Sequence, residues 1–379
     1  MITLEKYTAG HYQNSGLGYK YFVPSTIAGQ WQWTDQELNR LLEKAAIALG
    51  ELNSYSRFVP NIELFIQLHV TKEAVISSRI EGTQTQMGDA FLNETEIAPE
   101  KKNDWHEVNN YIAALKEAVK NIESLPISSR LLKQTHKILL ESVRGKEKLP
   151  GEFRRSQNWI GGISLADATF IPPHNDLVND LMGDLENFIH SDISTADLIK
   201  IAIIHYQFET IHPFLDGNGR IGRLLITLLL VEKKILSKPL LYLSSFFDKD
   251  RRLYYDNLSV VREKNNMLQW IKYFLAGIYE TAQQATNTLT SILDLKSETE
   301  QILHRDFRRR MNSATTLLNY LFQKPIVYVK EVKEVTNLSH KAANDLVNDF
   351  LDANILHEIT GYNRNRIFMF HKYLDLFNA

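Results

Sequence analysis

The sequence has no cysteine and no long uninterrupted hydrophobic segment. The first absence excludes disulfides, cysteine-ligated zinc, iron–sulfur clusters and a thiol nucleophile. The second excludes a membrane-spanning helix, which needs about 20 apolar residues, because even the most apolar stretch, 224–231, is far shorter. The opening MITLEKYTAG also lacks the basic and apolar segments of a signal peptide. We therefore expect a cytoplasmic protein without a membrane partner.

An excess of charge of either sign is also absent. Lysine and arginine total 43 against 45 aspartates and glutamates, which leaves a formal net charge of −2. A chain without an overall basic field is not expected to bind nucleic acid non-specifically. Its 44% of hydrophobic and 23% of charged residues are typical of a globular protein, and its 379 residues suffice for two or three domains.

Apolar residues recur at helical spacing through most of the chain. The first 30 residues are an exception, because their Gly, Tyr and Pro content favours an extended arm. Segment 149–173 is another, and its Gly and Pro content is typical of a hairpin or a long functional loop. Thr34 is predicted to cap the first helix, and Ser128 or Ser129 a later one. The spacing predicts helices over 34–49, 62–80, 104–122, 128–140, 177–189, 196–211, 218–231, 250–279 and 281–303.

The pattern changes once more at Met311. From here the predicted order is helix, strand, two helices and a two-stranded wing, which is the order of a winged helix-turn-helix domain. In chain order we expect helix 311–321, strand 326–329, helices 332–336 and 339–351, and strands 355–359 and 366–370 around a turn at 361–365.

The segment from His212 to Arg223, HPFLDGNGRIGR, carries the chemistry. It follows one apolar helix and opens another, and its Gly-Asn-Gly turn lets backbone N–H groups at a helix N-terminus face an anion. Asp216 is a hard oxygen ligand suited to Mg²⁺, and Asn218 brings an amide near the anion. Arg220 and Arg223, three residues apart, can both reach phosphate oxygens. The set indicates phosphoryl or nucleotidyl transfer.

Taken singly, these residues have structural explanations, because Asp-Gly-Asn-Gly is a common turn and a lone histidine is more often structural. Two arginines in the first turn of a helix, however, oppose its dipole. Their presence there favours a bound anion at the start of the helix.

The segment closely resembles the signature of the Fic/Doc family, His-x-Phe-x-[Asp/Glu]-Gly-Asn-Gly-Arg-x-x-Arg, at every position. The resemblance continues in FETIHPF before the motif, in GEFRRSQNWIGG and ATFIPP upstream, and in LYLSSFF downstream, and it covers most of residues 34–280. It implies a helical enzyme that transfers AMP from ATP to a hydroxyl group of a target protein, a reaction called AMPylation.

The resemblance also implies a role for each residue of the motif, with ATP and Mg²⁺ as the bound species. His212 is the general base that deprotonates a Ser, Thr or Tyr hydroxyl. Asp216 binds the Mg²⁺ that bridges the α- and β-phosphates. Pyrophosphate is the leaving group. Gly217, Asn218 and Gly219 form the anion hole around the α-phosphate, Arg220 holds the β-phosphate and Arg223 the γ-phosphate. The other nucleotide-binding residues that the resemblance implies are Glu81, His212, Ile221 and Gly222.

An inhibitory motif is the second implication. Ser77-Ser-Arg-Ile-Glu81-Gly82 resembles the family's [Ser/Thr]-x-x-x-Glu-[Gly/Asn], here on a helix N-terminal to the catalytic motif. A glutamate at a helix C-terminus gains from a cationic partner, which in the family is the second motif arginine. A forked pair between Glu81 and Arg223 would then keep Arg223 from the γ-phosphate. In some relatives the same glutamate orients a water that removes AMP, and the sequence leaves both directions open.

These observations define the expected fold class and domains. The fold is mainly α, a helical Fic core with a small β-hairpin flap at 149–173, plus a C-terminal winged helix-turn-helix domain. The flap is expected to pair with an extended stretch of the target. The expected domains are an arm and helical region carrying the inhibitory motif at 1–127, the catalytic domain at 128–285, a connecting helix at 286–310 and the winged helix domain at 311–379.

Partners and alternative functions follow from the same features. The expected partners are a target protein with a hydroxyl side chain, the chain itself through self-modification, and a second copy in a homodimer. The predicted recognition helix opposes DNA binding, because it carries Asp345, Asp349 and Asp352 against Lys341. The alternatives are a DNA-binding regulator or toxin–antitoxin-like protein, and an enzyme of the same fold that transfers phosphate or UMP.

Overall fold

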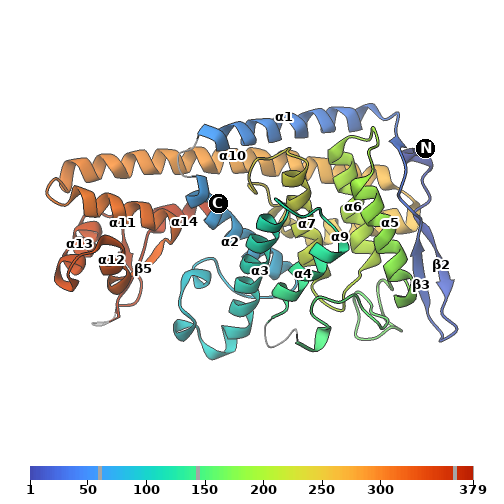
Figure 1. Cartoon of the computed structure of the whole chain (residues 1–379), viewed down its shortest axis with the longest axis horizontal. Coiled ribbons are helices and arrows are strands. Elements are labelled where there is room, and N and C mark those ends of the chain that lie inside the picture. The colour runs from blue at the N-terminus through green and yellow to red at the C-terminus, as the bar shows by residue number, and fades with distance from the viewer. Residues whose placement is uncertain (59–61, 142–145, 362–364, 379) are drawn as a thin grey trace.

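The computed structural model describes residues 1–58, 62–141, 146–361 and 365–378. As predicted, the fold is mainly helical (Figure 1). The helices are α1 Gln36–Phe58, α2 Ile62–Ile80, α3 Lys102–Asn121, α4 Ser129–Leu139, α5 Val178–His190, α6 Asp197–Ile211, α7 Asn218–Glu232, α8 Ser244–Lys249, α9 Arg251–Lys264, α10 Met267–Asp306, α11 Met311–Gln323, α12 Val329–Thr336, α13 His340–Asp352 and α14 His371–Asn378. The strands are β1 Ile2–Thr3, β2 Gly10–Asn14, β3 Lys20–Pro24, β4 Trp31–Gln32, β5 Ile326–Tyr328, β6 His357–Glu358 and β7 Ile367–Met369. Within these described ranges, no helix has the length and apolarity needed to cross a membrane.

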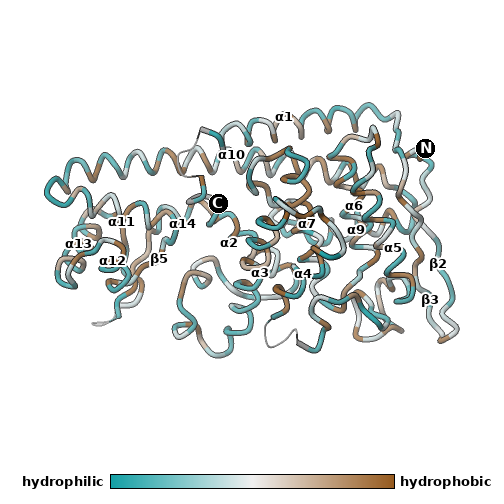
Figure 2. Tube along the Cα trace, in the orientation of Figure 1, coloured by the Kyte–Doolittle hydropathy of each residue, from teal (hydrophilic) through white to brown (hydrophobic). Residues whose placement is uncertain are grey.

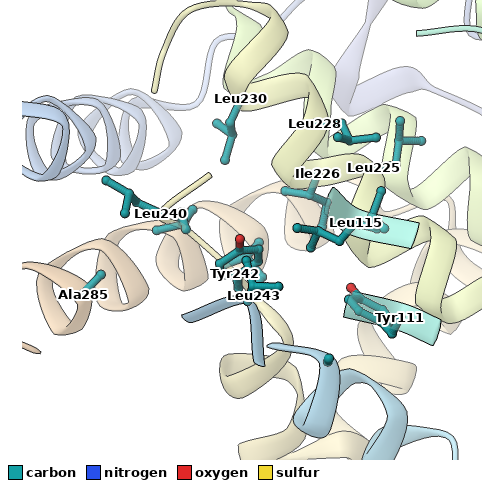
Figure 3. Close-up of a cluster of buried hydrophobic side chains, with 14 of the residues drawn as sticks. Tyr111, Leu115, Leu225, Ile226, Leu228, Leu230, Leu240, Tyr242, Leu243 and Ala285 are labelled. Atoms are coloured by element: carbon teal, nitrogen blue, oxygen red, sulfur yellow. The ribbon is translucent and has the colours of Figure 1, made fainter. Parts of the chain in front are cut away.

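Helices α6 and α7 lie at the centre of the core, where hydrophobic residues gather (Figure 2). Helix α6 is buried on every side from Leu198 to Ile211, so it shows no polar stripe. Leu225 and Ile226 of α7 meet Tyr111 and Leu115 of α3 in one hydrophobic cluster (Figure 3). Because the two helices are held so firmly, the loop that joins them is a rigid place for a functional site.

Helix α10 runs 40 residues without a break and lies along α1 (Figure 1). The predicted division near residue 280 is therefore wrong, because the apolar stripe of α10 continues past it through Ala282 and Leu289. The actual break comes earlier, at Asn265. This residue has a left-handed φ of 56° and accepts a hydrogen bond from the Ala9 N–H. The expected connecting helix, 286–310, corresponds mostly to the C-terminal half of α10.

The start of α1 also differs from the prediction. Asp35, not Thr34, caps the helix, because its carboxylate accepts from the Leu38 N–H at 2.7 Å. The same carboxylate accepts from Lys272 of α10 at 2.9 Å. One acidic side chain thus begins α1 and joins it to α10.

The first 32 residues form the extended arm that the composition predicts. Strands β2 and β3 pair as an antiparallel hairpin, and β1 pairs with β4 in parallel. Phe22 of β3 donates its backbone N–H to the Ile171 carbonyl, which places the arm on the expected flap. In the flap itself, the only bridge that the structure describes joins Ile160 and Phe170, so the segment is a pair of loops held at one rung, not a regular hairpin.

The C-terminal elements follow the predicted order, with helix α14 as an unpredicted addition. Their sheet has the antiparallel order β5-β7-β6, and the predicted turn at 361–365 falls partly outside the described residues. Helix α11 contacts α2, and the Phe377 ring of α14 lies 5.1 Å from the His69 ring of α2, edge to face. The C-terminal elements therefore rest directly on the helix that carries Ser77 and Glu81.

The cap of α4 allows a direct test of how this fold is held. The Ser128 hydroxyl accepts from the Leu131 N–H, whereas Ser129 uses only its backbone N–H, which donates to Glu186. We expect Ser128→Ala to lower the free energy of unfolding by about 1 kcal/mol in urea titrations. Ser129→Ala is the control and should change it by less than half as much. Equal losses in the two variants would contradict the assignment of the cap.

Candidate active site

The loop between α6 and α7 turns the chain through two left-handed residues. His212 ends α6 with φ 51° and ψ 59°, and its N–H donates to the Phe208 carbonyl. Gly217, with φ 76°, comes immediately before α7. The first turn of α7 therefore presents its free backbone N–H groups and the positive end of its dipole to the space beside His212.

Asn218 holds this loop in shape. Its side-chain oxygen accepts from the Phe214 N–H at 2.8 Å, and its side-chain nitrogen donates to the Phe214 carbonyl at 2.9 Å. Both ends of the amide are thus bonded within the loop, and the side chain is buried. The Asn218 side chain therefore serves the tight turn, whose own backbone groups need partners.

His136 of α4 holds the loop through hydrogen bonds and ring stacking, and the sequence did not predict this role. Its Nδ1 accepts from the Gly151 N–H at 2.9 Å, so Nε2 carries the proton and donates to the Asp216 carbonyl at 3.0 Å. Its ring stacks on Phe214 at 3.8 Å. Burial lowers the pKa of His136 to about 4, which keeps it neutral. A lone histidine 80 positions upstream carries no sequence signal for this contact.

Arg154 is the second support that the sequence analysis missed. Its buried guanidinium donates to the His212 carbonyl at 3.0 Å and also to the carbonyls of Ile211 and Pro173. Asn158 donates to the Phe214 carbonyl at 2.9 Å. One planar guanidinium therefore joins the end of α6 to the end of the flap.

The His212 imidazole lies half-buried beside the loop. Burial, together with the Arg154 guanidinium, lowers its pKa to about 4, although the Glu81 carboxylate opposes both effects. The imidazole is therefore neutral at neutral pH and can accept a proton. A neutral base beside an anion-accepting helix N-terminus suits deprotonation of an alcohol.

Asp216 is suited to the predicted Mg²⁺. Its side chain is 44% exposed at the mouth of the loop and accepts from the Gly217 N–H and from Arg220 at 3.4 Å. Across the described residues, no group of three or more His, Cys, Asp or Glu side chains could hold a metal by itself. A single accessible carboxylate fits Mg²⁺ of the kind that takes its other ligands from substrate phosphates and water.

Arg220 lies in the first turn of α7 with its side chain only 3% exposed. It donates to Glu107 of α3 at 3.1 Å and to Asp216, so the guanidinium is held between two acids. Glu107 has no place in the predicted motif. Only the packing of α3 against α7 brings it to the site.

Arg223 and Glu81 meet as predicted. Arg223 donates to one Glu81 carboxylate oxygen at 2.6 Å, and its Nε and terminal nitrogen donate to the hydroxyl and carbonyl of Ser77, both at 2.9 Å. The contact differs from the predicted forked pair, because Ser77 occupies part of the guanidinium. Burial by itself would lower the pKa of Arg223, but Glu81, Tyr254 and Glu209 together outweigh burial, and the pKa lies above its usual range.

The Glu81 carboxylate also covers the start of α7. A side-chain carbon at Gly219 would overlap with its Oε1, so glycine is required there while Glu81 is in place. Gly82 has a left-handed φ of 109°, which ends α2 directly after Glu81. The carboxylate therefore occupies the space beside the first turn of α7.

Ile221 and Gly222 face away from this space. Ile221 is fully buried in the core. Gly222 packs against Glu209 of α6, where a side-chain carbon would overlap with the carboxyl group, and its carbonyl contacts the His205 imidazole at 3.0 Å. Their position is explained by the close approach of α6 to α7. Burial raises the pKa of Glu209 to about 7.

Comparisons with known proteins agree with this geometry. Residues 39–120 match the Fic/DOC family N-terminal model, and residues 126–230 match the Fic/DOC family model. Over 277 residues the chain is 30% identical to the protein adenylyltransferase Fic of Culex quinquefasciatus, covering 68% of this chain and 50% of that protein. Over 90 residues it is 40% identical to a probable protein adenylyltransferase of Aquifex aeolicus, covering 24% of this chain and 26% of the relative.

Solved structures support the fold. A Fic family protein from Desulfovibrio desulfuricans matches with a TM-score of 0.55 at 18% identity, over 89% of this chain and 96% of that one. Fic-1 of C. elegans matches with a TM-score of 0.51 at 20% identity, over 68% of this chain and 73% of that one. The chain belongs to the Fic/DOC family. It spans half or less of the length of the two curated relatives above.

The state of His212 can be measured directly. We expect its ring protons to show no titration in NMR spectra between about pH 8 and pH 5.5, because the pKa of about 4 lies below this range. Loss of the resonance in His212→Ala assigns it. A midpoint near the usual value of 6.5 would contradict the buried, neutral imidazole.

Arg154 and its neighbour form a matched pair of variants. Arg154→Lys should lower the free energy of unfolding by about 2 kcal/mol, because a point charge cannot satisfy three separate carbonyl groups. Arg155 is the control, since its side chain is 75% exposed and, among the residues that the structure describes, pairs only with Glu152. Arg155→Lys should change the stability by less than about 0.5 kcal/mol. Similar losses in the two variants would show that Arg154 does not hold the loop.

Proposed function

We propose that this protein is a protein adenylyltransferase that transfers AMP from ATP to a Ser, Thr or Tyr hydroxyl and is held inactive by Glu81. One observation carries the proposal: a neutral imidazole, an anion-accepting helix N-terminus, an accessible carboxylate and two buried arginines converge on one loop. The relatives named protein adenylyltransferase add support.

The reaction needs one proton acceptor and one phosphate cradle. The target hydroxyl oxygen attacks the α-phosphorus of ATP, its proton passes to the His212 imidazole, and the bond to the β-phosphate oxygen breaks to release pyrophosphate. The backbone N–H groups of the first turn of α7 stabilise the negative charge that grows on the α-phosphate oxygens. Arg220 is placed to hold the β-phosphate and Arg223 the γ-phosphate.

Asp216 would hold Mg²⁺ at the mouth of the loop. When bound, the ion neutralises charge on the α- and β-phosphates. The protein residues act around it: Arg220 binds the Asp216 carboxylate and limits its orientation, and Glu107 fixes the other side of Arg220.

Inhibition follows from the contact between Arg223 and Glu81. While Arg223 is bonded to Glu81 and Ser77, it is not available to a γ-phosphate, and the Glu81 carboxylate places negative charge beside Gly219. An incoming triphosphate therefore lacks the Arg223 cation for its γ-phosphate, and the negative charge of Glu81 repels it. Withdrawal of Glu81 removes both obstacles at once.

We propose that the C-terminal elements bind a partner protein or a second copy of the chain. Helix α13 presents Asp345 and Asp349, and Arg310 lies next to both, at 2.5 Å from Asp349. Arg310 is therefore already paired with the acids of this helix. A helix of this charge repels DNA phosphates, so we do not assign a DNA-binding function.

Glu81→Gly tests both the reaction and the inhibition. We expect this variant to incorporate far more AMP than the wild type into itself or into a lysate protein, because it frees Arg223 and the space over Gly219. Ser77→Ala should have a smaller effect in the same direction, since it removes one of the bonds to Arg223. The measurement is intact-mass spectrometry after incubation with Mg²⁺ and ATP.

Two controls make the result specific. Adding His212→Ala to Glu81→Gly should reduce incorporation by on the order of 10²–10⁴, as expected for the loss of a general base. Incubation with UTP in place of ATP separates AMP transfer from UMP transfer by mass. Equal incorporation by the wild type and Glu81→Gly would rule out inhibition by Glu81, and a mass gain of one phosphate would rule out nucleotide transfer.

A further inference from the structure

A cavity lies on the face of α2 that carries Lys72 and Arg79, away from the loop between α6 and α7. It encloses about 780 Å³, a size typical of small-molecule sites. Helix α2, segment 84–87, α8, Gln284 of α10 and Phe377 of α14 line it. It therefore lies where the N-terminal helices, the centre of the molecule and the C-terminal elements meet.

The charge of this cavity is predominantly positive. Lys72, Arg79 and Lys249 line it against a single acid, Asp248. Lys72 has neither a hydrogen bond nor an ion pair with any residue that the structure describes. Burial lowers the pKa of Lys72, and the charge of Arg79 on the same helix face lowers it further. Three cations against one acid favour a bound anion.

Polar side chains without hydrogen-bond partners in the described structure line the two cavities that Lys72 borders. Thr85 lines the cavity, is 5% exposed, and its hydroxyl has no partner in the described structure. A smaller cavity of about 40 Å³ shares Lys72 with the first, and is lined by His69 Nε2 and the Tyr242 hydroxyl, which also lack partners there. Buried polar groups of this kind are normally bonded to protein, water or ligand.

Helix α2 connects this cavity to the catalytic site. Ser77 and Glu81, four residues apart, face Arg223, whereas Lys72 and Arg79 line the cavity on another face of the same helix. Arg79 lies two residues before Glu81. A ligand that displaces the Arg79 side chain would therefore shift the end of the helix from which Glu81 projects.

Asp248 of α8 fastens this end of α2. It accepts from Arg79 at 2.6 Å and from Arg251 at 2.7 Å, and Arg251 also reaches the Ile80 carbonyl at 3.5 Å. An anion in the cavity competes with Asp248 for Arg79, because both are acceptors for the same guanidinium. Loss of the Asp248 contact would loosen the residues that hold Glu81 on Arg223.

We propose that this cavity is a regulatory site for a small anion carrying phosphate or carboxylate groups, which binds Lys72 and Arg79 and relieves the inhibition by Glu81. Binding is independent of the reaction, whereas the regulatory part rests on the proposed AMP transfer. The two parts are therefore tested separately.

Binding is measured by isothermal titration of the full chain with inorganic phosphate and, separately, with citrate. These two probes distinguish a phosphate ligand from a carboxylate ligand. Lys72→Gln should weaken binding of the effective probe by about tenfold, as expected for the loss of one charge-assisted hydrogen bond. Thr85→Val should weaken it by a smaller factor. Lys116→Gln, an exposed lysine on α3, is the charge-matched control and should leave binding unchanged.

Regulation is measured as AMP incorporation with and without the same probe. The probe should raise incorporation by the wild type and have no effect on Glu81→Gly, in which the inhibition is already absent. Asp248→Asn should raise incorporation without any probe, since it releases Arg79 in the same way.

Each part has a result that overturns it. Failure of both probes to bind, or equal binding by the wild type and Lys72→Gln, would refute the anion site whatever the enzyme activity. Binding that leaves AMP incorporation unchanged would refute its regulatory role. If Glu81→Gly itself transfers no AMP, the proposed function fails while the binding result stands.

Discussion

The buried guanidinium of Arg223 is the constraint on which the site depends. A charge removed from water must have a partner, and in this structure Glu81 supplies it. In the proposed reaction the terminal phosphate of the nucleotide competes for the same guanidinium, so one residue would serve both nucleotide binding and inhibition. A side-chain carbon at Gly219 would overlap with the Glu81 carboxylate and crowd the Arg223 guanidinium, so the absence of a side chain there leaves room for this pair.

Around this charge, burial sets the protonation of the neighbouring groups. His212 and His136 are both kept neutral, with pKa values of about 4, and Glu209 is raised to about 7. In Glu73 of α2 the pKa is also raised to about 7 by burial, although Tyr111 and Ser244 donate hydrogen bonds to it. Few full charges are therefore buried near the loop. The arginines supply most of the positive charge that an anion would meet there.

Helix α2 connects three parts of the molecule. One face holds Arg223, another lines the cationic cavity, and its side chain His69 contacts Phe377 at the C-terminal end of the chain. A helix that makes contacts on several faces cannot shift at one of them without disturbing the others. A change in the C-terminal elements would therefore affect the proposed inhibition by Glu81, as would a change in the loop between α6 and α7.

Local spacing in the sequence predicts most of the helices and the loop between α6 and α7, and α2, for example, begins and ends where the apolar pattern and Gly82 predict. The contact between Glu81 and Arg223, which lie 142 positions apart, is implied only by the resemblance of two separate motifs to the family pattern. The side chains that complete the site from distant parts of the chain are found only in the folded molecule. Arg154, His136 and Glu107 bind the loop or its arginine from other elements, and the Asn218 side chain bonds to the backbone of Phe214. Contacts of this kind depend on how helices pack in space, and because packing imposes no regular spacing on the residues involved, the sequence carries no local signal of it.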